Sequence, residues 1–490
     1  MMSPLLSLIL IPLVTAAFCM AGSAPRRISL FGAGANLLLS LYLLASYNLE
    51  IGGFQFVSEN ALFPAYGLSF SLGADGLSMV LLLLATLVTL AAVWVTPQVE
   101  KSPGMFYACL LLISGGAIGA FASIDLFFFY AFHELALIPT FLLIGIWGSG
   151  DRQRIAWKVT IYLAFGSFIL LLGLIGLWLA VPEGLRTFDI RLLQQLGYAG
   201  ILTPGPVVYL LLLFGFGILI ALFPFHTWAP EAYASAPAPA AMLHAGVLKK
   251  FGLYGLLRLA VPIFPEEIQQ FAHLVLVLLL GNILYVGFVT LAQKRLDLLL
   301  GYSSVMHMGY AFLGFVALNQ LGLAGMSLML FAHGLTVAAL FALCGEINRR
   351  TGTLEFSELG GLAGVTPKLG LLFGFAAMAS VGLPGFATFA SEIMIFFGAF
   401  ARGAVGSFNW FQTATALALW GVVISAVYML RAYRNIFWGA RGSAIKADTA
   451  DISSGARWAV IILIAVLLLT GFRPGLLLDY LHPVFAYLPR

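Results

Sequence analysis

Residues 78–95 read SMVLLLLATLVTLAAVWV, an apolar run without a charged side chain. An α-helix rises 1.5 Å per residue, so a run of about 20 residues crosses a hydrocarbon core of roughly 30 Å. Similar runs recur from one end of the chain to the other, near residues 4–20, 28–47, 78–95, 106–123, 125–147, 157–180, 206–228, 240–262, 270–292, 297–317, 321–346, 368–400, 410–433 and 456–472. They predict a polytopic membrane protein with about 14 transmembrane helices.

The composition supports an all-α membrane protein. Apolar residues make up 61% of the chain and charged residues 9%, whereas soluble domains carry roughly 25% charged residues. The runs lack the alternation of a barrel strand, and backbone groups in lipid must be hydrogen-bonded internally, which leaves helices. The polar stretches 48–77 and 439–456 are expected to be loops, too short to fold alone. The dispersed net charge of +4 argues against a nucleic-acid partner.

The three cysteines, Cys19, Cys109 and Cys344, all lie in apolar spans and form no CxxC pair. This spacing argues against a disulfide, a structural zinc or an iron–sulfur cluster held by this chain alone. We therefore expect any redox chemistry to take place on other subunits.

Basic residues predict the orientation. The first apolar run has no basic residue before it, and Arg26 and Arg27 follow it, so we interpret it as a spanning helix rather than a signal peptide. With the N-terminus outside, lysine and arginine divide between the cytoplasmic and outer sides roughly 16 to 6, as the positive-inside rule expects. The outer group is Arg186, Arg191, Arg258, Arg402, Arg473 and Arg490.

Two spans contain prolines that should interrupt them. The seventh contains Leu222 to Pro230, LFPFHTWAP, and the twelfth contains Val381 to Gly385, VGLPG. Proline removes a backbone donor and clashes with the carbonyl four residues earlier, so each helix is expected to break there. Breaks at corresponding places of two halves indicate an inverted repeat with a transport path at the breaks. Ordinary proline kinks are the alternative, and the spacing alone leaves both open.

Ionisable residues inside spans are candidates for function, because a charge at the bilayer centre is costly. Glu134 lies roughly 14 Å into the fifth span, where burial disfavours its charge and a nearby cation favours it. The alternative role for Glu134 is a structural hydrogen bond. Lys249 and Lys250 lie midway along the eighth span and point about 100° apart, so they should face different partners. Snorkelling towards the interface is the alternative for this pair.

Histidines and a second buried acid extend this set. His307 and His333 lie within the tenth and eleventh spans, and Glu392 follows the break in the twelfth. Histidine titrates near neutral pH and can relay protons between a carboxylate and a lysine, although either histidine alone is more often a packing residue. His226 and His244 extend the chain of titratable groups.

These residues lie in motifs that resemble the antiporter-like subunits of respiratory complex I, which are related to Mrp-type antiporter chains. The resemblance covers about residues 70 to 435 and rests on ordered segments: 73–78 (GADGLS), 133–148, 224–232 (PFHTWAPEA), 245–255 (AGVLKKFGLYG), 302–309 and 332–345. Within this family the chain is most similar to the M-type subunits. Glu392 stands where the sister subunits carry lysine, and the chain ends soon after its last span, without a long lateral helix.

The resemblance implies fourteen helices with two inverted five-helix repeats and broken seventh and twelfth helices. It divides the chain into helices 1–3 (1–100), a first repeat (101–262), a second repeat (263–435) and a loop with the last helix (436–490). It also implies a proton path. Its implied residues are Glu134, Lys158, Lys250, His307, His333 and Glu392. We add Lys249, His226 and His244 to the path from their positions in or near the spans.

The sequence departs from the family pattern at two places. The family carries a lysine seven residues before the histidine of the broken segment, and this chain has Leu219 there. That lysine is the usual partner of the fifth-helix glutamate, and Lys249 and His244 are hypothetical substitutes. The family order of an acid followed by Lys-Arg is also reversed, since Asp297 follows Lys294 and Arg295, which is expected to keep a local ion pair.

The resulting prediction is a proton-translocating membrane-arm subunit of a complex-I-type NADH–quinone oxidoreductase in the bacterial cytoplasmic (inner) membrane. Its implied partners are antiporter-like neighbours, small membrane chains and the lipid bilayer. No cofactor is expected on this chain, and NADH, FMN, iron–sulfur clusters and quinone are expected in partner subunits. The alternatives are an Mrp-type antiporter or membrane-bound hydrogenase subunit, and a non-pumping structural spacer.

Overall fold

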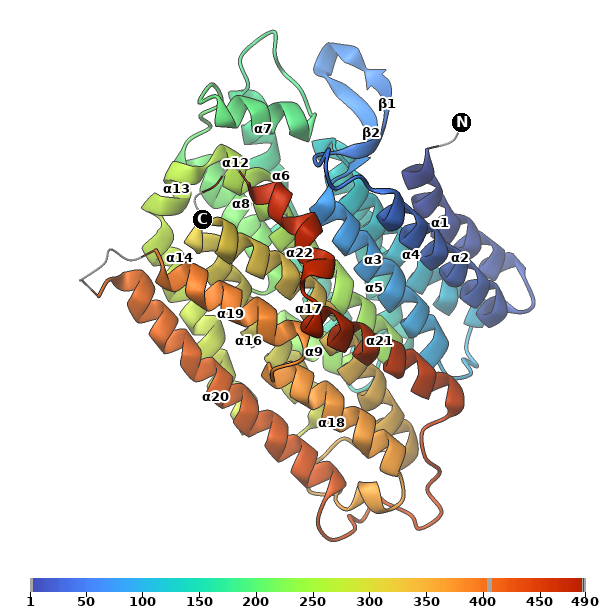
Figure 1. The fold of residues 1–490 in the computed structure, drawn as a ribbon. Helices are drawn as coiled ribbons and strands as arrows, with labels where there is room; N and C mark the ends of the chain where they lie inside the picture. The colour runs from blue at the N-terminus through green and yellow to red at the C-terminus, as the bar shows by residue number, and fades with distance from the viewer. Residues whose placement is uncertain (1–2, 403–407, 487, 489–490) are drawn as a thin grey trace.

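The computed structural model describes every residue except 1–2, 403–407, 487 and 489–490, so Arg490 lies outside the described residues. The chain forms a bundle of roughly parallel and antiparallel helices (Figure 1). Eleven helical stretches within the described part are long and apolar enough to cross a membrane. They are α1 (Pro4–Ala21), α2 (Pro25–Ser46), α3 (Gly76–Val95), α4 (Pro103–Ala122), α5 (Leu126–Trp147), α6 (Arg152–Ala180), α14 to α15 (Ala272–Ala292), α16 (Leu296–Ala317), α17 (Gln320–Thr351), α20 (Trp410–Phe437) and α21 (Ser454–Phe472). The prediction of a polytopic helical protein is confirmed.

Shorter helices complete the bundle and its ends. The shorter α-helices are α7 (Ile190–Tyr198), α8 (Pro206–Ile220), α9 (Trp228–Ser235), α10 (Ala238–Leu243), α11 (Lys250–Gly255), α12 (Val261–Ile263), α13 (Pro265–Gln270), α18 (Pro367–Val381), α19 (Ala387–Phe400) and α22 (Gly475–Leu481). The π-helical segments are η2 (His244–Leu248), η3 (Leu256–Ala260) and η4 (Gly281–Tyr285), the last between α14 (Ala272–Leu280) and α15 (Val286–Ala292). The 3₁₀ turns are η1 (Pro64–Tyr66), η5 (Leu362–Gly364) and η6 (His482–Phe485).

Both proline segments interrupt the helices, although α9 already begins within the first one at Trp228, and the helices before them end in the same way. α8 ends at Ile220, where the amide of Leu222 donates to the carbonyl of Gly217 at 2.8 Å. α18 ends at Val381, where the amide of Leu383 donates to the carbonyl of Met378 at 3.2 Å. In both, the residue after the helix has a positive φ, which completes a Schellman-type C-terminal cap.

The polar stretch 48–77 is not simply a loop. It contains an antiparallel hairpin of β1 (Gln55–Phe63) and β2 (Leu68–Ala74), with Asn60 opposite Phe70. Some backbone groups on the unpaired edge of β2 find hydrogen-bond partners in a neighbouring loop. The amide of Ile124, for example, donates to the carbonyl of Ser71. The all-α prediction is therefore wrong for this segment, because a loop with nearby backbone partners can pair as short strands.

The predicted eighth span is also not one regular α-helix. Between α10 and α12 it contains the π segments η2 and η3, in which the hydrogen bonds reach five residues back. The amide of Lys249, for example, donates to the carbonyl of His244 at 3.0 Å. Each π turn widens the helix and changes the direction of the side chains that follow, which matters for the two lysines.

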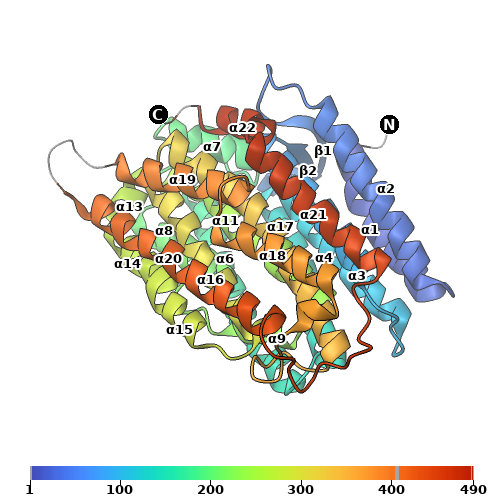
Figure 2. The same cartoon turned by 60° about the horizontal axis from the view of Figure 1, so that its bottom comes forward.

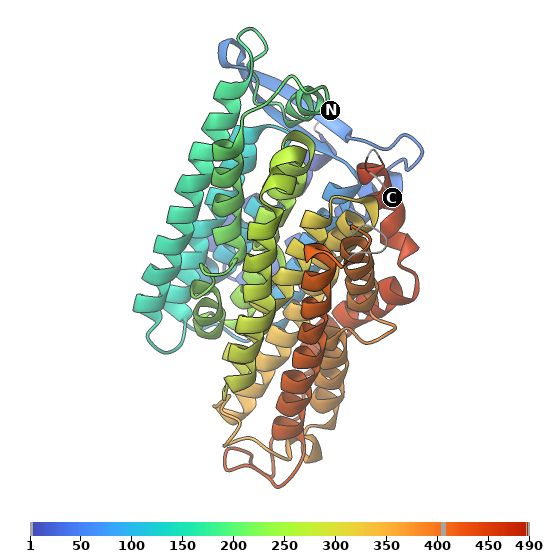
Figure 3. The ribbon, with the colours of Figure 1, turned by 90° about the vertical axis from the view of Figure 1, so that its left-hand side faces the viewer.

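The helices form an inner and an outer group. α3, α16 and α17 are almost entirely buried within the bundle, whereas α1, α2, α6, α20 and α21 keep one side exposed. Figure 2 shows α18 and α21 covering α17, and Figure 3 shows α14 and α15 between α6 and α20. The start of α1, the hairpin, α7 and α22 lie towards one end of the bundle (Figure 1).

Candidate functional site

Lys250 and His333 meet at the centre of the bundle. Lys250 is fully buried, and its Nζ lies 2.8 Å from Nδ1 of His333 on α17. Its ammonium also donates to the carbonyl of Ala245 in η2 at 3.3 Å. A close backbone contact between Gly246 and Gly334 brings η2 against α17 and so places these two side chains together.

Lys249 turns towards a different helix. Its Nζ donates to the backbone carbonyl of Ser304 on α16 at 3.2 Å, and lies 3.4 Å from the hydroxyl of the same residue. The ammonium also lies 5.8 Å from the centre of the Tyr233 ring. The prediction that the adjacent lysines face different partners is confirmed, and both are buried inside the bundle.

His307 continues the row beyond His333. The two imidazole ring centres are 5.8 Å apart. The His307 ring lies between two backbone carbonyls, with Nδ1 2.8 Å from that of Ser303 and Nε2 3.0 Å from that of Ser380. Both histidines line a cavity of about 10 Å³, which has room for about one water molecule.

Glu392 lies at the far end of this row, on α19. Its carboxylate packs against Gly382, where α18 ends with φ +76°. Tyr310 interacts with Glu392, and the Tyr310 ring centre lies 5.7 Å from that of His307. Tyr428 also interacts with Glu392 and shares a 2.7 Å hydrogen bond with the Ser303 hydroxyl. Both tyrosines are thus near enough to Glu392 for electrostatic coupling, and the Tyr310 hydroxyl has no hydrogen-bond partner among the described residues.

Glu134 lies in a separate cluster on α5. The hydroxyl of Ser167 on α6 donates to its Oε1 at 2.5 Å, and Nδ1 of His133 lies 3.4 Å from the same oxygen. The Glu134 side chain is 33% exposed on the outside of the chain, while that of His133 is 2% exposed. The structural hydrogen bond considered for Glu134 is thus present, without excluding a titratable role.

Lys158 is not part of the central row. Its Nζ lies 2.8 Å from Oε1 of Glu231 on α9, and both side chains are partly exposed. This pair joins α6 to the helix that follows the first proline segment. In the sequence, Glu231 is noted only as part of the PFHTWAPEA segment, and its pairing with Lys158 was not predicted.

His226 and His244 lie on either side of α9. His226, within the proline segment, stacks on Phe223 with ring centres 5.6 Å apart. His244 begins η2, and its ring packs against Trp228 and Tyr233. Both His244 ring nitrogens are buried without a hydrogen-bond partner among the described residues.

Leu219 stands at the position where the family carries a lysine, and it is buried between helices. It is 3% exposed, and its Cδ2 lies 3.3 Å from the position of a Cβ on Gly166 of α6. Gly166 precedes Ser167, the donor to Glu134, so Leu219 lies beside the Glu134 cluster. Lys249 instead hydrogen-bonds Ser304 on α16.

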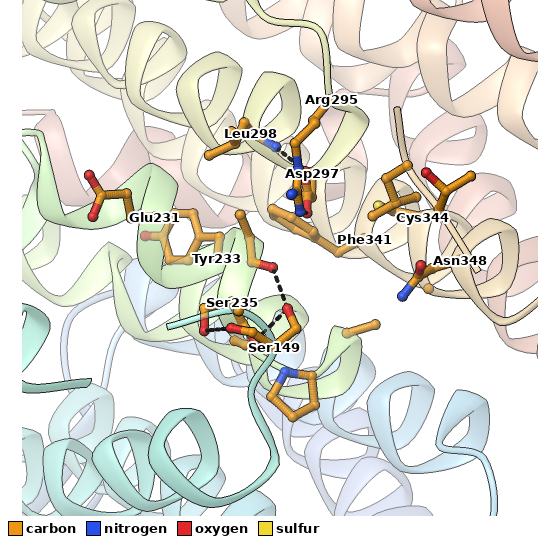
Figure 4. Close-up of a pocket in the computed structure, with 18 of the residues that line it drawn as sticks. Ser149, Glu231, Tyr233, Ser235, Arg295, Asp297, Leu298, Phe341, Cys344 and Asn348 are labelled. Atoms are coloured by element: carbon orange, nitrogen blue, oxygen red, sulfur yellow. Dashed lines mark hydrogen bonds and ion pairs between the residues drawn. The ribbon is translucent and has the colours of Figure 1, made fainter. Parts of the chain in front are cut away.

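An open pocket of about 630 Å³ lies between the ends of α9, α16 and α17 (Figure 4). Tyr233, whose ring faces the Lys249 ammonium, lines it together with Glu231 and Asp297. Arg295, also at the pocket, pairs with Asp297 at 2.7 Å, as expected from the reversed charge order. The hydrogen bonds and charge of Asp297 raise the pKa of Arg295, so this guanidinium stays charged.

Sequence reasoning missed the uncharged members of the site. Tyr310 and Tyr428 lie in apolar helices, where tyrosine is usually a packing residue, and only the fold brings them to Glu392. Tyr233 directly follows the PFHTWAPEA segment, and this position could have identified it as a candidate. His133 was visible as the neighbour of Glu134, although adjacent residues on a helix do not normally face one another. Among the described residues, no group of three His, Cys, Asp or Glu side chains is placed to hold a metal ion.

A bundle of apolar helices that buries Lys250, His333 and Glu392 is typical of a membrane subunit that moves protons or other ions. The chain belongs to the family described as NADH:quinone oxidoreductase/Mrp antiporter, transmembrane, whose model matches residues 123–418.

More specifically, the chain is 37% identical to NAD(P)H-quinone oxidoreductase chain 4-2 of Synechocystis, over 89% of this chain and 78% of that protein. It is similar to a chain of respiratory complex I from Thermus thermophilus with bound NADH, with 31% identity and a TM-score of 0.89 over 99% of this chain and 98% of that one. A chain of the Mrp complex of a Dietzia species shares the fold, with a TM-score of 0.86 and 22% identity over 99% and 97% of the two chains.

Proposed function

We propose that this chain carries protons across the membrane as an antiporter-like subunit in the membrane arm of a complex-I-type quinone oxidoreductase. The observation that carries the proposal is the row from Lys250 through His333 and His307 towards Glu392. Every member is at least nine-tenths buried. Lys250 contacts His333 directly, and the ring centre of His333 lies 5.8 Å from that of His307. A row of buried titratable groups is costly in a membrane and is typical of proton relays.

The geometry suggests how a proton moves along the row. The ammonium of Lys250 donates to Nδ1 of His333 when that nitrogen is unprotonated, and the proton continues to His307 through the intervening cavity. From His307 it reaches Glu392 past the hydroxyls of Tyr310 and Tyr428. A change of charge on one member alters the proton affinity of the next, so a charge change in a neighbouring subunit can drive transfer.

Glu134 and Lys158 have different places in the proposed path. Glu134 is partly exposed on the outside of the chain and is the member that responds to a neighbouring subunit. Lys158 is held by Glu231 beside the pocket of Figure 4, where protons would enter from the aqueous phase. Tyr233 lies between that pocket and Lys249, and His244 packs against Tyr233.

The proposed architecture has fourteen spans. α8 with α9, the stretch from α10 to α12, and α18 with α19 would supply the three spans beyond the eleven long helices. The matching caps at the ends of α8 and α18 support two inverted repeats, at 101–262 and 263–435, after helices in 1–100 and before a loop and last helix in 436–490. The excess of basic residues in one set of loops supports an N-terminus outside the bacterial cytoplasmic membrane.

The partners follow from the relatives. The Thermus chain with the same fold is part of a respiratory complex I with bound NADH. By this likeness the partner subunits of our chain would hold NADH, FMN, iron–sulfur clusters and quinone, while neighbouring antiporter-like and small membrane chains would pack against its exposed helices.

Isolation of the intact complex in mild detergent tests the partners. The proposal expects quinone-reducing and iron–sulfur subunits to co-purify with this chain. Recovery of small antiporter chains alone would instead support a cation/proton antiporter, which the fold of the Mrp chain keeps as the second candidate.

Replacement of Glu134 tests the pumping role. In membrane vesicles, Glu134→Gln should retain complex assembly but lower the number of protons pumped per quinone reduced. If Glu134→Gln and Lys250→Met both pump normally in an assembled complex, this chain is a structural spacer and the proposed path is wrong.

A further inference from the structure

We propose that His133 is the proton-exchanging partner of Glu134, and that His244 continues this branch to the two central lysines. The inference rests on the proposed function, because it extends the same proton path. It concerns a residue to which the family resemblance assigns no role, although the family-like segment 133–148 begins with it.

The first support is the surroundings of Glu134. Its side-chain hydrogen-bond partners are His133 and Ser167, and the Tyr130 hydroxyl lies beside it. No lysine or arginine in the described part of the chain forms a hydrogen bond or ion pair with it. Ser167 and Tyr130 carry hydroxyls that stabilise a carboxylate but do not take up a proton near neutral pH, so His133 is the one base in contact with the acid.

The second support is that His133 is held in place. Its ring is buried and stacks on Phe251, with ring centres 4.0 Å apart and planes inclined by 19°. Phe251 directly follows Lys250, so the histidine is anchored to the helix that carries the central lysines. A histidine fixed in this way presents Nδ1 to Glu134 and leaves Nε2 for a second partner.

The third support is His244, which begins η2, the segment that packs against α5 and directly precedes the two lysines. α5 packs against η2, and His244 interacts electrostatically with both His133 and Lys249. Its side chain is 5% exposed, and neither ring nitrogen has a hydrogen-bond partner among the described residues. An unpartnered buried imidazole at this point can accept a proton from one side and release it to the other.

The step conserves protons without any further reactant. The Glu134 carboxyl transfers a proton to Nδ1 of His133, and His133 releases the proton on Nε2 towards His244. Glu134 becomes a carboxylate, His133 returns to a neutral ring, and His244 passes one proton towards Lys249. Lys249 accepts this proton in its neutral amine form. Tautomer exchange then restores both imidazole rings, and Glu134 takes up a new proton from outside the branch before the next transfer.

His133→Phe is the main test, because phenylalanine keeps the stack on Phe251 and removes both nitrogens. In the intact complex, we expect His133→Phe to lower the protons pumped per quinone reduced as far as Glu134→Gln does, and the double variant to lose no more than either single one. His273→Phe is the matched control, since His273 is an exposed histidine that packs on Trp410 and should pump normally.

A rescue distinguishes a base from a packing residue. Leu219 lies beside Gly166 and Ser167, so Leu219→Lys places an ammonium near Glu134. We expect it to restore pumping in the His133→Phe background. If the phenylalanine variant lowers assembly, His133→Gln with and without Leu219→Lys provides the same comparison.

The infrared carboxyl band of Glu134, identified by its loss in Glu134→Gln, provides a second readout. It should shift in His133→Phe and not in His273→Phe. Normal pumping and an unshifted band in an assembled His133→Phe complex would overturn the inference. If Glu134→Gln and Lys250→Met abolish pumping at the same time, the proposed function stands and only the role of His133 fails.

Discussion

Gly246 in η2 and Gly334 in α17 touch through their backbones. A Cβ on Gly334 would lie 2.6 Å from the carbonyl oxygen of Gly246, and a Cβ on Gly246 would lie 2.9 Å from that of Gly334. Small residues at such crossings let membrane helices approach closely. The contact bears on the proposed proton path because His333 adjoins Gly334, and Lys250 lies one turn beyond Gly246.

Gly334→Ala should therefore separate Lys250 from His333. The added methyl group meets a backbone carbonyl that cannot rotate away, so the helices must move apart, at a cost of about 1–3 kcal/mol. We expect lower pumping with quinone reduction less affected, measured as protons moved per quinone reduced. Gly364→Ala is the control, because a Cβ there has open space; equal behaviour of the two variants would contradict the prediction.

Lys250→Met should uncouple pumping while leaving the protein folded. Methionine fills a similar volume and removes a buried ammonium that has no acidic partner among the described residues, which offsets the lost hydrogen bond to Nδ1 of His333. Assembly should therefore stay normal, while proton movement through this chain is lost. Lys446→Met, in an exposed loop, provides the control. A Lys250→Met complex that pumps normally would remove Lys250 from the path.

Glu392→Gln should block the far end of the row. The amide keeps the size of the side chain but cannot release a proton at neutral pH, so pumping should fall without loss of assembly. Gly382→Ala should also disturb Glu392, because the Glu392 carboxylate packs against Gly382. Its Cβ would collide with the Glu392 carboxylate, and a positive φ costs a non-glycine residue about 1–2 kcal/mol. Pumping by both variants at the level of Gly364→Ala would argue against an exit at Glu392.

The buried pair of Asp75 and Arg258 should be structural. Arg258 donates to both carboxylate oxygens of Asp75 and to the hydroxyl of Ser78, which also contacts Tyr254. Arg258→Met leaves a buried carboxylate unpaired and should destabilise the chain by about 3–5 kcal/mol. The midpoint of thermal unfolding of the purified complex measures the effect.

Removal of the charge on Asp75 checks that explanation. Asp75→Asn keeps the cap on the Ser78 amide and should restore most of the stability when combined with Arg258→Met. Arg441→Met, at an exposed position, should leave the midpoint unchanged. A double variant as unstable as Arg258→Met alone would show that the cost comes from lost packing rather than from an unpaired charge.

The sequence by itself determined the class of protein. Apolar runs such as 78–95 are long enough to cross a bilayer, and lipid leaves their backbone only the helix. It also identified Glu134, Lys250 and Glu392 as candidates for function, because charged side chains are costly inside such runs. The sequence also predicted that the helices end near Pro224 and Pro384, because proline cannot continue the helical hydrogen-bond ladder.

Only the tertiary structure decided which of these charges meet. Lys250 and His333 are far apart in the chain, and a glycine contact that no periodicity reveals brings them together. The π turns of η2 direct Lys249 to Ser304, where a regular helix of the same residues would point it elsewhere. The partner of Glu134 depends on packing in the same way, because Phe251 on another helix holds His133 beside it. The spacing of a sequence gives the period of each helix, whereas partners across helices follow from close packing between them.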